Sequence, residues 1–556
     1  MHTKTLLKAA IASAVAMVMA PSVVAAEKIN MAMCTMCHQD VSAFHQKGAH
    51  KGISCDTCHT GLEKHQSNPG KETRPATKIG PEPCATCHKP QYESLYKAND
   101  KKIGRISKKL TTGPSPDPFF DRAMGKHGFT KEHDEPRSHV FMTLDQVIYD
   151  RSYGGRFQPK DGWLYLTYEG GAFNLQDKIK DMYPDNNQQK PHRYATAAAI
   201  NPVCQSCKTS DLMLDWAFLG DKTENAKWSR QSNPVEIGRE LQHAINCNFC
   251  HDPHSTQPRI IRDALIDALT RKDFPTVYSE DPNHTKIEVH ARGVQRGIDR
   301  KIATMEKADS KLMCGQCHVE YNCNPGQEAD SGKPITMADR RTNVFPFAKV
   351  KDVQKFYDHI NFRDFKHPMT GAKLLKFQHP DTETFWGSKH DKAGVTCQNC
   401  HMPKVKGEDG KMYTLHWNTS PRNYMKETCL SCHKDKTEAQ MNRVITGMKA
   451  YYMGKLRETE SRMNEMFDAF NEALNAGVSE DVLNKAREQH TIAHSNWESW
   501  TAVNGAYFHN VEEAVQSMDI GAKAAETATK ILRDAIRAKA DAKAGAKKSA
   551  KKVSKK

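Results

Sequence analysis

Apolar side chains are scarce in this sequence for its length. Of the 556 residues, 38% are Ala, Val, Ile, Leu, Met, Phe, Trp, Tyr or Cys, a low share for a chain long enough to form roughly two to four domains. Beyond residue 26 no apolar run approaches the ~20 residues that a membrane-spanning helix needs, so the mature chain is expected to be soluble. Either much of the chain is disordered, or something other than side chains fills its core.

Proline is absent after Pro421, and strand-like runs are few. Segments 438–476 and 479–500 are rich in Ala, Glu, Lys, Met and Leu, which predicts two long helices separated by a turn at Gly477. A further helix is predicted over residues 511–539, and residues 163–168 have the pattern of a short strand. The predicted fold class is mainly α, with long C-terminal helices and little β structure.

The first twenty-six residues have the pattern of a secretory signal peptide. Lys4 and Lys8 precede an apolar stretch over residues 6–20, and small residues precede Glu27, where cleavage is expected. The alternative is an uncleaved membrane anchor. A cleaved leader is favoured, which predicts a periplasmic protein.

The seventeen cysteines resolve the question of the core. Sixteen of them form pairs separated by two residues, and only Cys323 stands apart. A disulfide framework gives no reason for this spacing, whereas attachment to the two vinyl groups of a c-type haem does. Seven pairs are followed by histidine: Cys34 and Cys37 by His38, Cys55 and Cys58 by His59, Cys84 and Cys87 by His88, Cys247 and Cys250 by His251, Cys314 and Cys317 by His318, Cys397 and Cys400 by His401, and Cys429 and Cys432 by His433. The eighth pair, Cys204 and Cys207, is followed by Lys208, so eight covalent haems are predicted to fill the core.

The net charge of +15 does not indicate nucleic-acid binding. Each haem brings two propionates, which would offset the excess of lysine and arginine and give many of these residues anionic partners. Part of the excess also lies in residues 540–556, a Lys- and Ala-rich segment that is predicted to be a disordered basic tail.

Histidines are plentiful enough to supply second iron ligands. The histidine after each pair is the expected proximal ligand, and a haem that only transfers electrons gains from a distal histidine on its other face. The strongest distal candidates are His50, His139, His390, His416 and His509, followed by His45, His65, His127, His133, His254 and His494. For any one of them the alternative is a surface or propionate-bonded histidine.

Lys208 marks one haem as different from the other seven. A lysine amine binds iron only when it is deprotonated, so burial and the metal itself must depress its pKa. With lysine on one face, the opposite face of this haem is predicted to stay open for a small ligand. The alternative is a lysine-ligated haem without catalysis, or a ligand supplied from elsewhere.

The order of three CxxCH motifs, one CxxCK and four CxxCH resembles that of the octahaem cytochrome c nitrite reductases. The resemblance is strongest over residues 137–513, where residues 314–321, 376–380, 394–403 and 413–417 match the family's motifs. It implies a three-haem module and linker over residues 27–135, followed by a five-haem catalytic domain over residues 136–539. It also implies a homo-oligomer, either a trimer or a hexamer.

The resemblance assigns roles by position. Lys208 would be the proximal ligand of the catalytic haem, with Tyr321, His379 and Arg151 around the bound anion and Arg156 as the alternative arginine. His379 would donate protons, because an unperturbed histidine titrates near neutral pH. A structural calcium ion would bind side-chain oxygens of Glu320 and Gln378 and backbone carbonyls of Tyr321 and Lys376. Asp381 stands where the family often has glutamate.

Cys323 lies two residues beyond Tyr321. On the residues alone, a small buried free thiol is the simpler reading. The resemblance instead implies a thioether crosslink between the Cys323 sulfur and the ring of Tyr321.

The implied activity is the six-electron reduction of nitrite to ammonia, with hydroxylamine and sulfite as further substrates. An electron-donor cytochrome or quinol dehydrogenase would supply the electrons. The alternatives are an octahaem hydroxylamine oxidoreductase, a tetrathionate reductase, and a multihaem electron carrier with no substrate. Lys208 argues against the first, the segments around Glu320 and Gln378 against the second, and a nitrite-sensitive high-spin haem would exclude the third.

Overall fold

The computed structural model describes residues 29–78, 80–95, 149–150, 158–159, 203, 206–214, 232, 245–295, 298–322, 325–336, 338–367, 369–503 and 505–553. The chain divides into two compact units between Lys78 and Ile79. The first two cysteine pairs belong to the N-terminal unit, and the other six belong to the second unit. Within the described residues, no helix combines the length and apolar character needed to cross a membrane.

The N-terminal unit is small and has almost no side-chain core. α2 (Met31–Cys37) contains the first cysteine pair, and the 3-10 helix η1 (Cys55–Thr57) begins at the second. The unit also contains α3 (Gln39–Lys47), α4 (Leu62–Ser67), η2 (Lys71–Thr73) and the antiparallel strands β1 (His59–Thr60) and β2 (Ala76–Thr77). Of its described apolar side chains, only that of Leu62 is buried. Packing of side chains alone therefore gives this unit little stability.

Two cysteine pairs of the second unit each lie on a single helical turn. α16 (Cys247–Cys250) and α23 (Cys397–His401) each contain both cysteines of a pair. Residues three apart share one face of a helix, so the two sulfurs of each pair point the same way. Side chains fix where these helices begin, since Asn246 accepts a hydrogen bond from the Asn248 amide and Thr396 forms a capping box.

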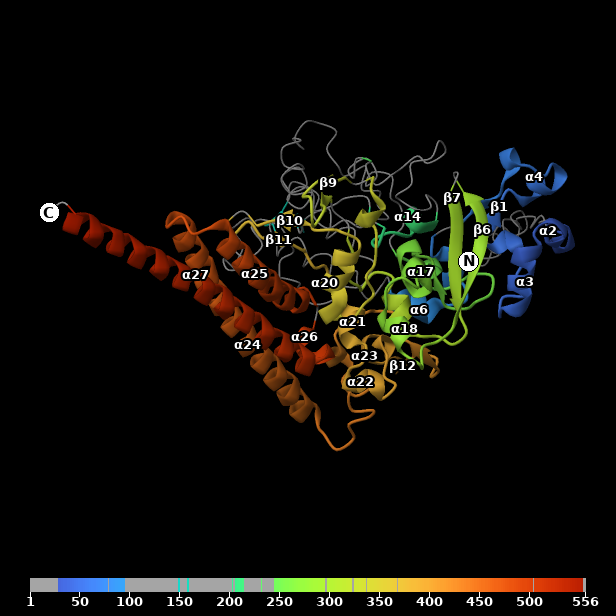
Figure 1. Cartoon of the computed structure of the whole chain (residues 1–556). Helices are drawn as coiled ribbons and strands as arrows, with labels where there is room; N and C mark the ends of the chain where they lie inside the picture. Colours follow the sequence, from blue (N-terminus) through green and yellow to red (C-terminus); the bar gives the residue numbers. More distant parts are fainter. Residues whose placement is uncertain are drawn as a thin grey trace, which may run out of the picture. The chain divides into compact units, whose positions relative to one another are not determined.

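Further short helices connect the cysteine pairs of the second unit (Figure 1). They are α5 (Glu82–Ala85), α6 (Lys89–Leu95), α14 (Ser210–Leu214), α17 (Asp263–Thr270), α18 (Val277–Glu280), α19 (Ser310–Cys314), η6 (Arg340–Thr342), α20 (Val350–His359), α21 (Asp381–Phe385), α22 (Lys389–Lys392) and η7 (Pro421–Tyr424).

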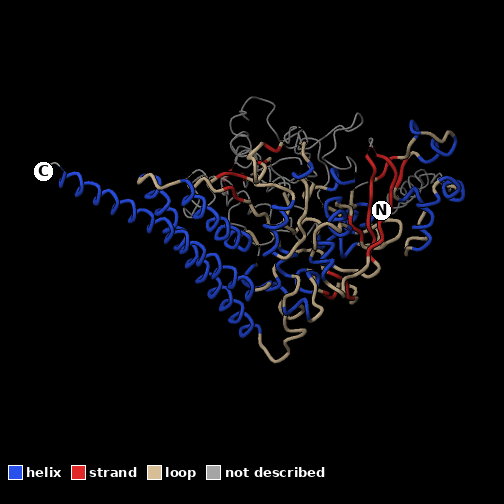
Figure 2. The backbone as a smooth tube through the Cα atoms, in the orientation of Figure 1, coloured by secondary structure: helices blue, strands red, loops and turns tan. Residues whose placement is uncertain are grey.

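In the described part of the chain, the β structure consists of small antiparallel sheets (Figure 2). The largest described sheet has the order β5–β7–β6, with β5 (Arg259–Ile260), β6 (Ile287–Gln295) and β7 (Ile298–Met305). The two-stranded sheets pair β3 (Tyr149–Asp150) with β4 (Gln158–Pro159), β8 (Gly326–Gln327) with β9 (Pro334–Ile335), β10 (Phe365–Lys366) with β11 (Lys373–Leu374), and β12 (Lys404–Lys406) with β13 (Met412–Thr414). The strand expected over residues 163–168 lies outside the described residues.

The C-terminal helices confirm the prediction of a mainly α fold. α24 (Glu438–Asn475), α25 (Glu480–Thr501) and α27 (Val511–Val553) pack side by side, with the short α26 (Ala506–His509) between the last two in sequence (Figure 1). Thr437 and Gln440 form a capping box at the start of α24, and Gly477 adopts a φ of +67° after its end. The core between the helices is apolar and includes Met463, Met466, Phe467, Phe470, Trp497, Trp500 and Met518.

The basic C-terminal segment differs from the prediction of disorder. Residues 540–553 continue α27, and Figure 1 shows the end of this helix extending beyond α24 and α25. Alanine and lysine both have high helix propensity, so the segment can propagate a helix that packing has already nucleated.

Candidate haem network and active site

The cysteines that the structure describes form no disulfides. Cys58 in the second motif is half-buried, and Cys87 in the third motif and Cys432 in the eighth are exposed. Cysteine is ordinarily among the most buried residue types, so thiols at the surface are unusual unless a bound group covers them. Each of these three cysteines is the second of its pair, and each is available for a haem thioether. Covalent attachment at these positions stays a prediction.

Among the described residues, three pairs that join a histidine after a cysteine pair to a distal candidate have the spacing of ligands on opposite faces of one iron. An iron bound roughly 2 Å from each of two ring nitrogens places the ring centres about 6 Å apart. The ring centres lie 6.2 Å apart in the His38–His65 pair, 6.4 Å apart in His433–His390 and 6.4 Å apart in His401–His509. Each pair joins a histidine that follows a cysteine pair to a distal candidate. The residues present therefore fit a bis-histidine haem at these motifs.

A lowered pKa keeps several histidines near the cysteine pairs in the neutral form that binds metal. Burial lowers the pKa of His251 and of His509 to about 4, so both rings are neutral. Burial, followed by the neighbouring His88, lowers the pKa of His416 despite a hydrogen bond to the Thr414 carbonyl. His416 also depresses the pKa of His251. His416 therefore lies near His88 and His251, each of which follows a cysteine pair.

The other distal candidates have mixed positions. His50 lies in the turn between α3 and η1, and His45 lies in α3. His254 is 4.0 Å from Asp252, whereas His494 bonds the Glu498 carboxylate at 2.9 Å and meets the Leu375 carbonyl at 3.0 Å. His494 therefore has a structural role within the second unit. His127, His133 and His139 lie outside the described residues.

Cysteines of different motifs touch one another in the second unit. Cys207 contacts Cys317, Cys84 contacts Cys247, and Cys314 contacts Cys397 through side-chain hydrogen bonds. Cys429 lies close enough to Cys400 to contribute to raising the pKa of Cys400. These thiols stand for the thioether sulfurs of a mature cytochrome, so haems attached at these motifs would be near neighbours.

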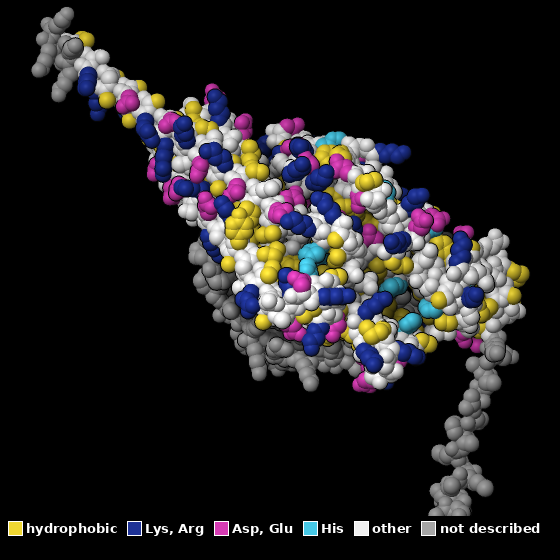
Figure 3. Space-filling view, turned by 90° about the horizontal axis from the view of Figure 1, so that it is seen from below, with side chains coloured by type: hydrophobic (Ala, Val, Ile, Leu, Met, Phe, Trp, Pro, Cys, Tyr) yellow, Lys and Arg dark blue, Asp and Glu magenta, His cyan; other side chains and the backbone are white. Residues whose placement is uncertain are grey.

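Histidine rings reach the surface of the molecule beside apolar side chains (Figure 3). Among the paired rings, His433 is exposed and His390, His401 and His509 are half-buried. A side-chain core would bury such rings, whereas a haem placed between each pair would cover them.

The Lys208 motif faces the predicted catalytic residues. Cys207 is buried and Lys208 is half-buried, while Cys204 lies outside the described residues. Lys208 is close enough to His379 to contribute to lowering its pKa. The rings of Tyr321 and His379 lie 5.5 Å apart at an angle of 66°, and Tyr321 is buried. Lys208, Tyr321 and His379 thus come together from separate parts of the sequence.

The surroundings of His379 change the expected protonation of its ring. Part of the ring is accessible, but the dense surroundings lower its pKa to about 3, mainly through desolvation. Its Nδ1 is buried without a hydrogen-bond partner. The expectation that His379 titrates near neutral pH was wrong for this environment, because burial removes the hydration that an imidazolium needs. The ring is neutral and has one N–H to donate.

Arg151, Arg156 and Cys323 lie outside the described residues, but a different arginine lies beside the Lys208 motif. Arg262 is 2% exposed, donates from Nη1 to Ser206 Oγ, and lies 5.4 Å from the ring centre of Phe345. Its guanidinium brings positive charge to the motif. Sequence reasoning missed Arg262, because no local motif marks it and only folding brings it to the Lys208 motif.

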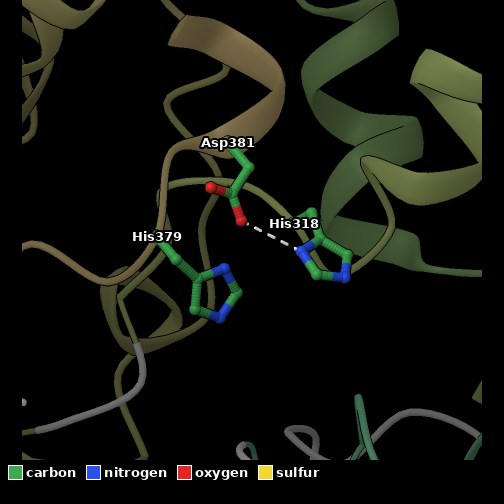
Figure 4. A group of neighbouring side chains, drawn as sticks. All are labelled: His318, His379 and Asp381. Carbon is green, nitrogen blue, oxygen red and sulfur yellow. Dashed lines mark hydrogen bonds and ion pairs between the residues drawn. The ribbon is translucent and has the colours of Figure 1, made fainter. Parts of the chain in front are cut away.

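Asp381 forms a hydrogen bond with His318, the histidine that follows the sixth cysteine pair (Figure 4). Its Oδ2 accepts a hydrogen bond from Nδ1 of His318 at 3.0 Å, and the ring of His379 lies 5.7 Å from that of His318. Ligand atoms of these three residues fall within 4.8 Å of one another, close enough to hold a metal ion. However, His318 follows a cysteine pair and its Nε2 is the expected iron ligand. The carboxylate therefore acts on the outer nitrogen of that ring.

The proposed calcium ligands surround a buried cluster of acids. Glu320 is 1% exposed and accepts hydrogen bonds from the Gln378 amide at 2.8 Å and from the Tyr357 hydroxyl at 3.1 Å. The Glu320 amide donates to Glu383, and the Lys376 amide donates to Asp364 at 2.7 Å.

Burial raises the pKa of Asp364 to about 7 and those of Glu320 and Glu383 well above the usual range. Asp364 Oδ1 and Glu383 Oε2 are buried without hydrogen-bond partners. The Lys376 ammonium offsets part of this charge near Asp364. Buried carboxylates with free oxygens are the donor set that a hard cation such as calcium requires, so the residues present fit the ion.

Comparisons with known proteins agree with this geometry. The family model for cytochrome c552 matches residues 162–556. Cytochrome c-552 of Haemophilus influenzae is 29% identical over 73% of this chain and 66% of its own length. The cytochrome c nitrite reductase subunit NrfA of Nitratidesulfovibrio vulgaris is 28% identical over 64% of this chain and 63% of its own length. The chain thus spans slightly less than two thirds of these relatives.

Among solved structures, the catalytic subunit NrfA of cytochrome c nitrite reductase from Desulfovibrio desulfuricans, described with two calcium sites, has a TM-score of 0.53. It is 20% identical, and the match covers 83% of this chain and 87% of that subunit. This likeness supports the same mainly α fold. With a family model that matches most of its length, the chain belongs to the cytochrome c552 family of proteins with c-type haems.

Proposed function

We propose that this chain is an octahaem cytochrome c that reduces nitrite to ammonia at the haem of the Lys208 motif. The observation that carries the proposal is the convergence of Lys208, Tyr321 and His379 on one motif. Relatives named cytochrome c nitrite reductase make nitrite the favoured substrate.

Seven histidine motifs and the Lys208 motif would hold the eight haems, and these groups supply electron transfer and an iron that binds the anion. Contacts between cysteines of different motifs support a continuous route in the second unit. The third motif meets the fifth, and Cys250 of the fifth lies close enough to Cys314 of the sixth to raise its pKa. The sixth motif also meets the seventh, and it meets the fourth through Cys317 and Cys207. Electrons arriving at any of these motifs would have a short path to Lys208.

Side chains around this motif would bind and polarise the anion. Arg262 supplies a buried positive charge, and Arg151 is proposed as a further arginine of the pocket. The neutral ring of His379 can donate its one N–H to a nitrite oxygen, and the hydroxyl of Tyr321 can relay protons. Fixed donors and charges in a water-poor site stabilise developing negative charge on oxygen. With a pKa near 3, His379 would pass protons along from a donor and would not store one.

Calcium is proposed at Glu320, Gln378 and the carbonyls of Tyr321 and Lys376. The cation would offset the buried carboxylates of Glu320, Asp364 and Glu383. Since Tyr321 follows Glu320 and His379 follows Gln378, one ion would position both pocket residues.

A spectrum and an assay of the holoprotein test this function together. One high-spin haem should change its electron paramagnetic resonance signal when nitrite is added, and reduced viologen plus nitrite should yield ammonia. Hydroxylamine oxidation or tetrathionate reduction without ammonia formation would identify one of the alternative enzymes. Eight low-spin haems that ignore nitrite would indicate an electron carrier.

A pair of histidine variants locates the activity. His379→Asn should lower the rate of ammonia formation by about 100-fold or more, because it removes a positioned donor. The control is His359→Asn, which changes an exposed histidine at the end of α20 that faces Asp273. Equal activity of the two variants would place the chemistry elsewhere.

The remaining proposals have separate measurements. A thioether between Tyr321 and Cys323 would lower the mass of the peptide that contains both residues by two hydrogen atoms. Cleavage before Glu27 would be read from the N-terminal sequence of periplasmic protein. A trimer or hexamer, as the resemblance implies, would be measured by light scattering, and an electron-donor cytochrome or quinol dehydrogenase by its reduction of the purified chain.

A further inference from the structure

Asp381 is fixed against His318 by the backbone as well as by its side chain. It is the first residue of α21, is 8% exposed, and accepts from His318 Nδ1 at 3.0 Å (Figure 4). The amide of the next residue, Thr382, donates to the His318 carbonyl at 3.0 Å. The Thr384 hydroxyl donates to the Asp381 carbonyl, which closes the first turn of α21. The carboxylate is thus held in one place relative to the ring.

A carboxylate at this nitrogen has a defined effect on a metal-bound imidazole. It draws the N–H proton toward itself, makes the opposite nitrogen a stronger donor and stabilises the oxidised metal. His401 provides an internal contrast, because its Nδ1 meets the neutral carbonyl of Thr419 at 2.9 Å. The two proximal histidines belong to neighbouring motifs but have outer partners of different charge.

The position of the sixth motif among the other motifs makes the carboxylate partner of His318 relevant to electron transfer. Cys317 contacts Cys207 of the Lys208 motif, and Cys314 contacts Cys397 of the seventh motif. The sixth-motif haem is therefore the relay between the proposed catalytic haem and the seventh motif. A low potential at this relay favours release of the electron to an acceptor that has bound an anion.

We propose that Asp381 is a positioning residue that lowers the reduction potential of the sixth-motif haem through its hydrogen bond to His318, and so directs electrons to the Lys208 motif. The inference rests on the proposed haem attachment. Its potential-lowering part does not require that nitrite be the substrate.

The test is a redox titration of the full-length holoprotein with Asp381→Asn, followed by optical and paramagnetic resonance spectra. The sixth-motif haem should become easier to reduce by about tenfold in its equilibrium constant, equivalent to about 59 mV for one electron. The affected signal should be the one magnetically coupled to the high-spin haem. Asp381→Glu, which keeps the carboxylate, should restore most of the wild-type potential.

The matched control is Asp281→Asn. Asp281 is a half-buried carboxylate whose partners are the Trp386 indole, at 3.0 Å, and the Lys311 ammonium, at 3.9 Å. The Asp281→Asn variant loses the same charge and should leave all eight reduction potentials unchanged. An equal shift in both variants would show a general field effect and overturn the specific role of Asp381.

Haem content, measured by mass spectrometry, separates a folding defect from a change of potential. If Asp381→Asn loses haem at the sixth motif, Asp381→Ser is the second variant, because it also removes the carboxylate and puts a smaller polar side chain in its place. Unchanged potentials in a fully loaded variant would reject the proposal. Failure of the proposed nitrite chemistry would instead show in the wild-type protein as absence of ammonia, with the Asp381 shift still measurable.

Discussion

The haem-motif region of the second unit, residues 245–433, and the C-terminal helices differ in how their buried charged groups are paired. Between α24, α25 and α27 the core is mainly one apolar cluster, and the buried Glu460 and Glu498 beside it are paired with Arg457 and His494. The haem-motif region has separate apolar clusters and, beside them, more buried charged groups, including carboxylate oxygens of Asp364 and Glu383 without hydrogen-bond partners. A buried charge is stable only with a partner. We therefore expect the helices to fold on packing, and the haem-motif region to depend on the haems and the cation proposed above.

The largest effect should come from withholding haem. In chain produced without haem attachment, amide protection from hydrogen exchange should be lost across residues 245–433 and largely kept in α24, α25 and α27 up to about Lys539. The reason is that the paired imidazoles and clustered cysteines have no partners without haem, while the apolar helix core remains. Hydrogen-exchange mass spectrometry measures both regions in one sample. Equal loss in both would mean that the helices also depend on haem.

Removing a large core side chain should have the next largest effect, and this effect should fall on the C-terminal helices. Trp500→Ala should lower the free energy of unfolding of the helices by about 3–5 kcal/mol, because Trp500 is fully buried and its loss leaves a cavity. The haem spectrum of the folded fraction should not change. Tyr451→Ala on α24, where the side chain is 58% exposed, should change stability by less than ~0.5 kcal/mol. Chemical denaturation followed by circular dichroism compares the two variants.

This contrast explains which parts of the structure the sequence could predict. The long helices follow from a local signal, since Ala, Glu, Lys, Met and Leu recur without proline and Thr437 supplies a capping box. By comparison, β6 and β7 were missed, although Ile287, Val289 and Ala291 alternate with polar residues as in a half-buried strand.

Features of the site that arise from burial could not be read from the sequence. The motif around His379 was recognisable, but its low pKa depends on surroundings contributed by several segments. Arg262 lies far in sequence from Tyr321 and becomes relevant only when folding brings it to the Lys208 motif. The role of Asp381 was hidden for the same reason, because its partner His318 is 63 residues away.

Calcium removal tests whether the buried acids need a partner of their own. A chelator should lower the melting temperature, because calcium that binds only the folded chain stabilises it by about 2.7 kcal/mol at 100 times its dissociation constant. Glu320→Gln should abolish this dependence on calcium. Glu328→Gln, which changes a more accessible carboxylate bonded to Ser331, should retain it. If the chelator did not change the melting temperature of the wild-type protein, Lys376 would be the main cation of this cluster.

The smallest effect is expected where a helix has no packing partner. Residues 540–553 continue α27 but are exposed wherever their burial is described, so helix propensity alone holds this segment. Ala544→Pro costs about 3 kcal/mol of local helix stability, more than an unpacked alanine- and lysine-rich segment can supply, and should unravel it. The melting temperature of the bundle should stay the same, because the segment contributes no buried apolar surface.

The control, Ala528→Pro, places the same substitution at a fully buried position of α27 and should destabilise the whole bundle. Hydrogen exchange of residues 540–553 and thermal unfolding together distinguish the two variants. A lower melting temperature in Ala544→Pro would show that the segment packs against another surface, because propensity alone cannot couple it to the bundle.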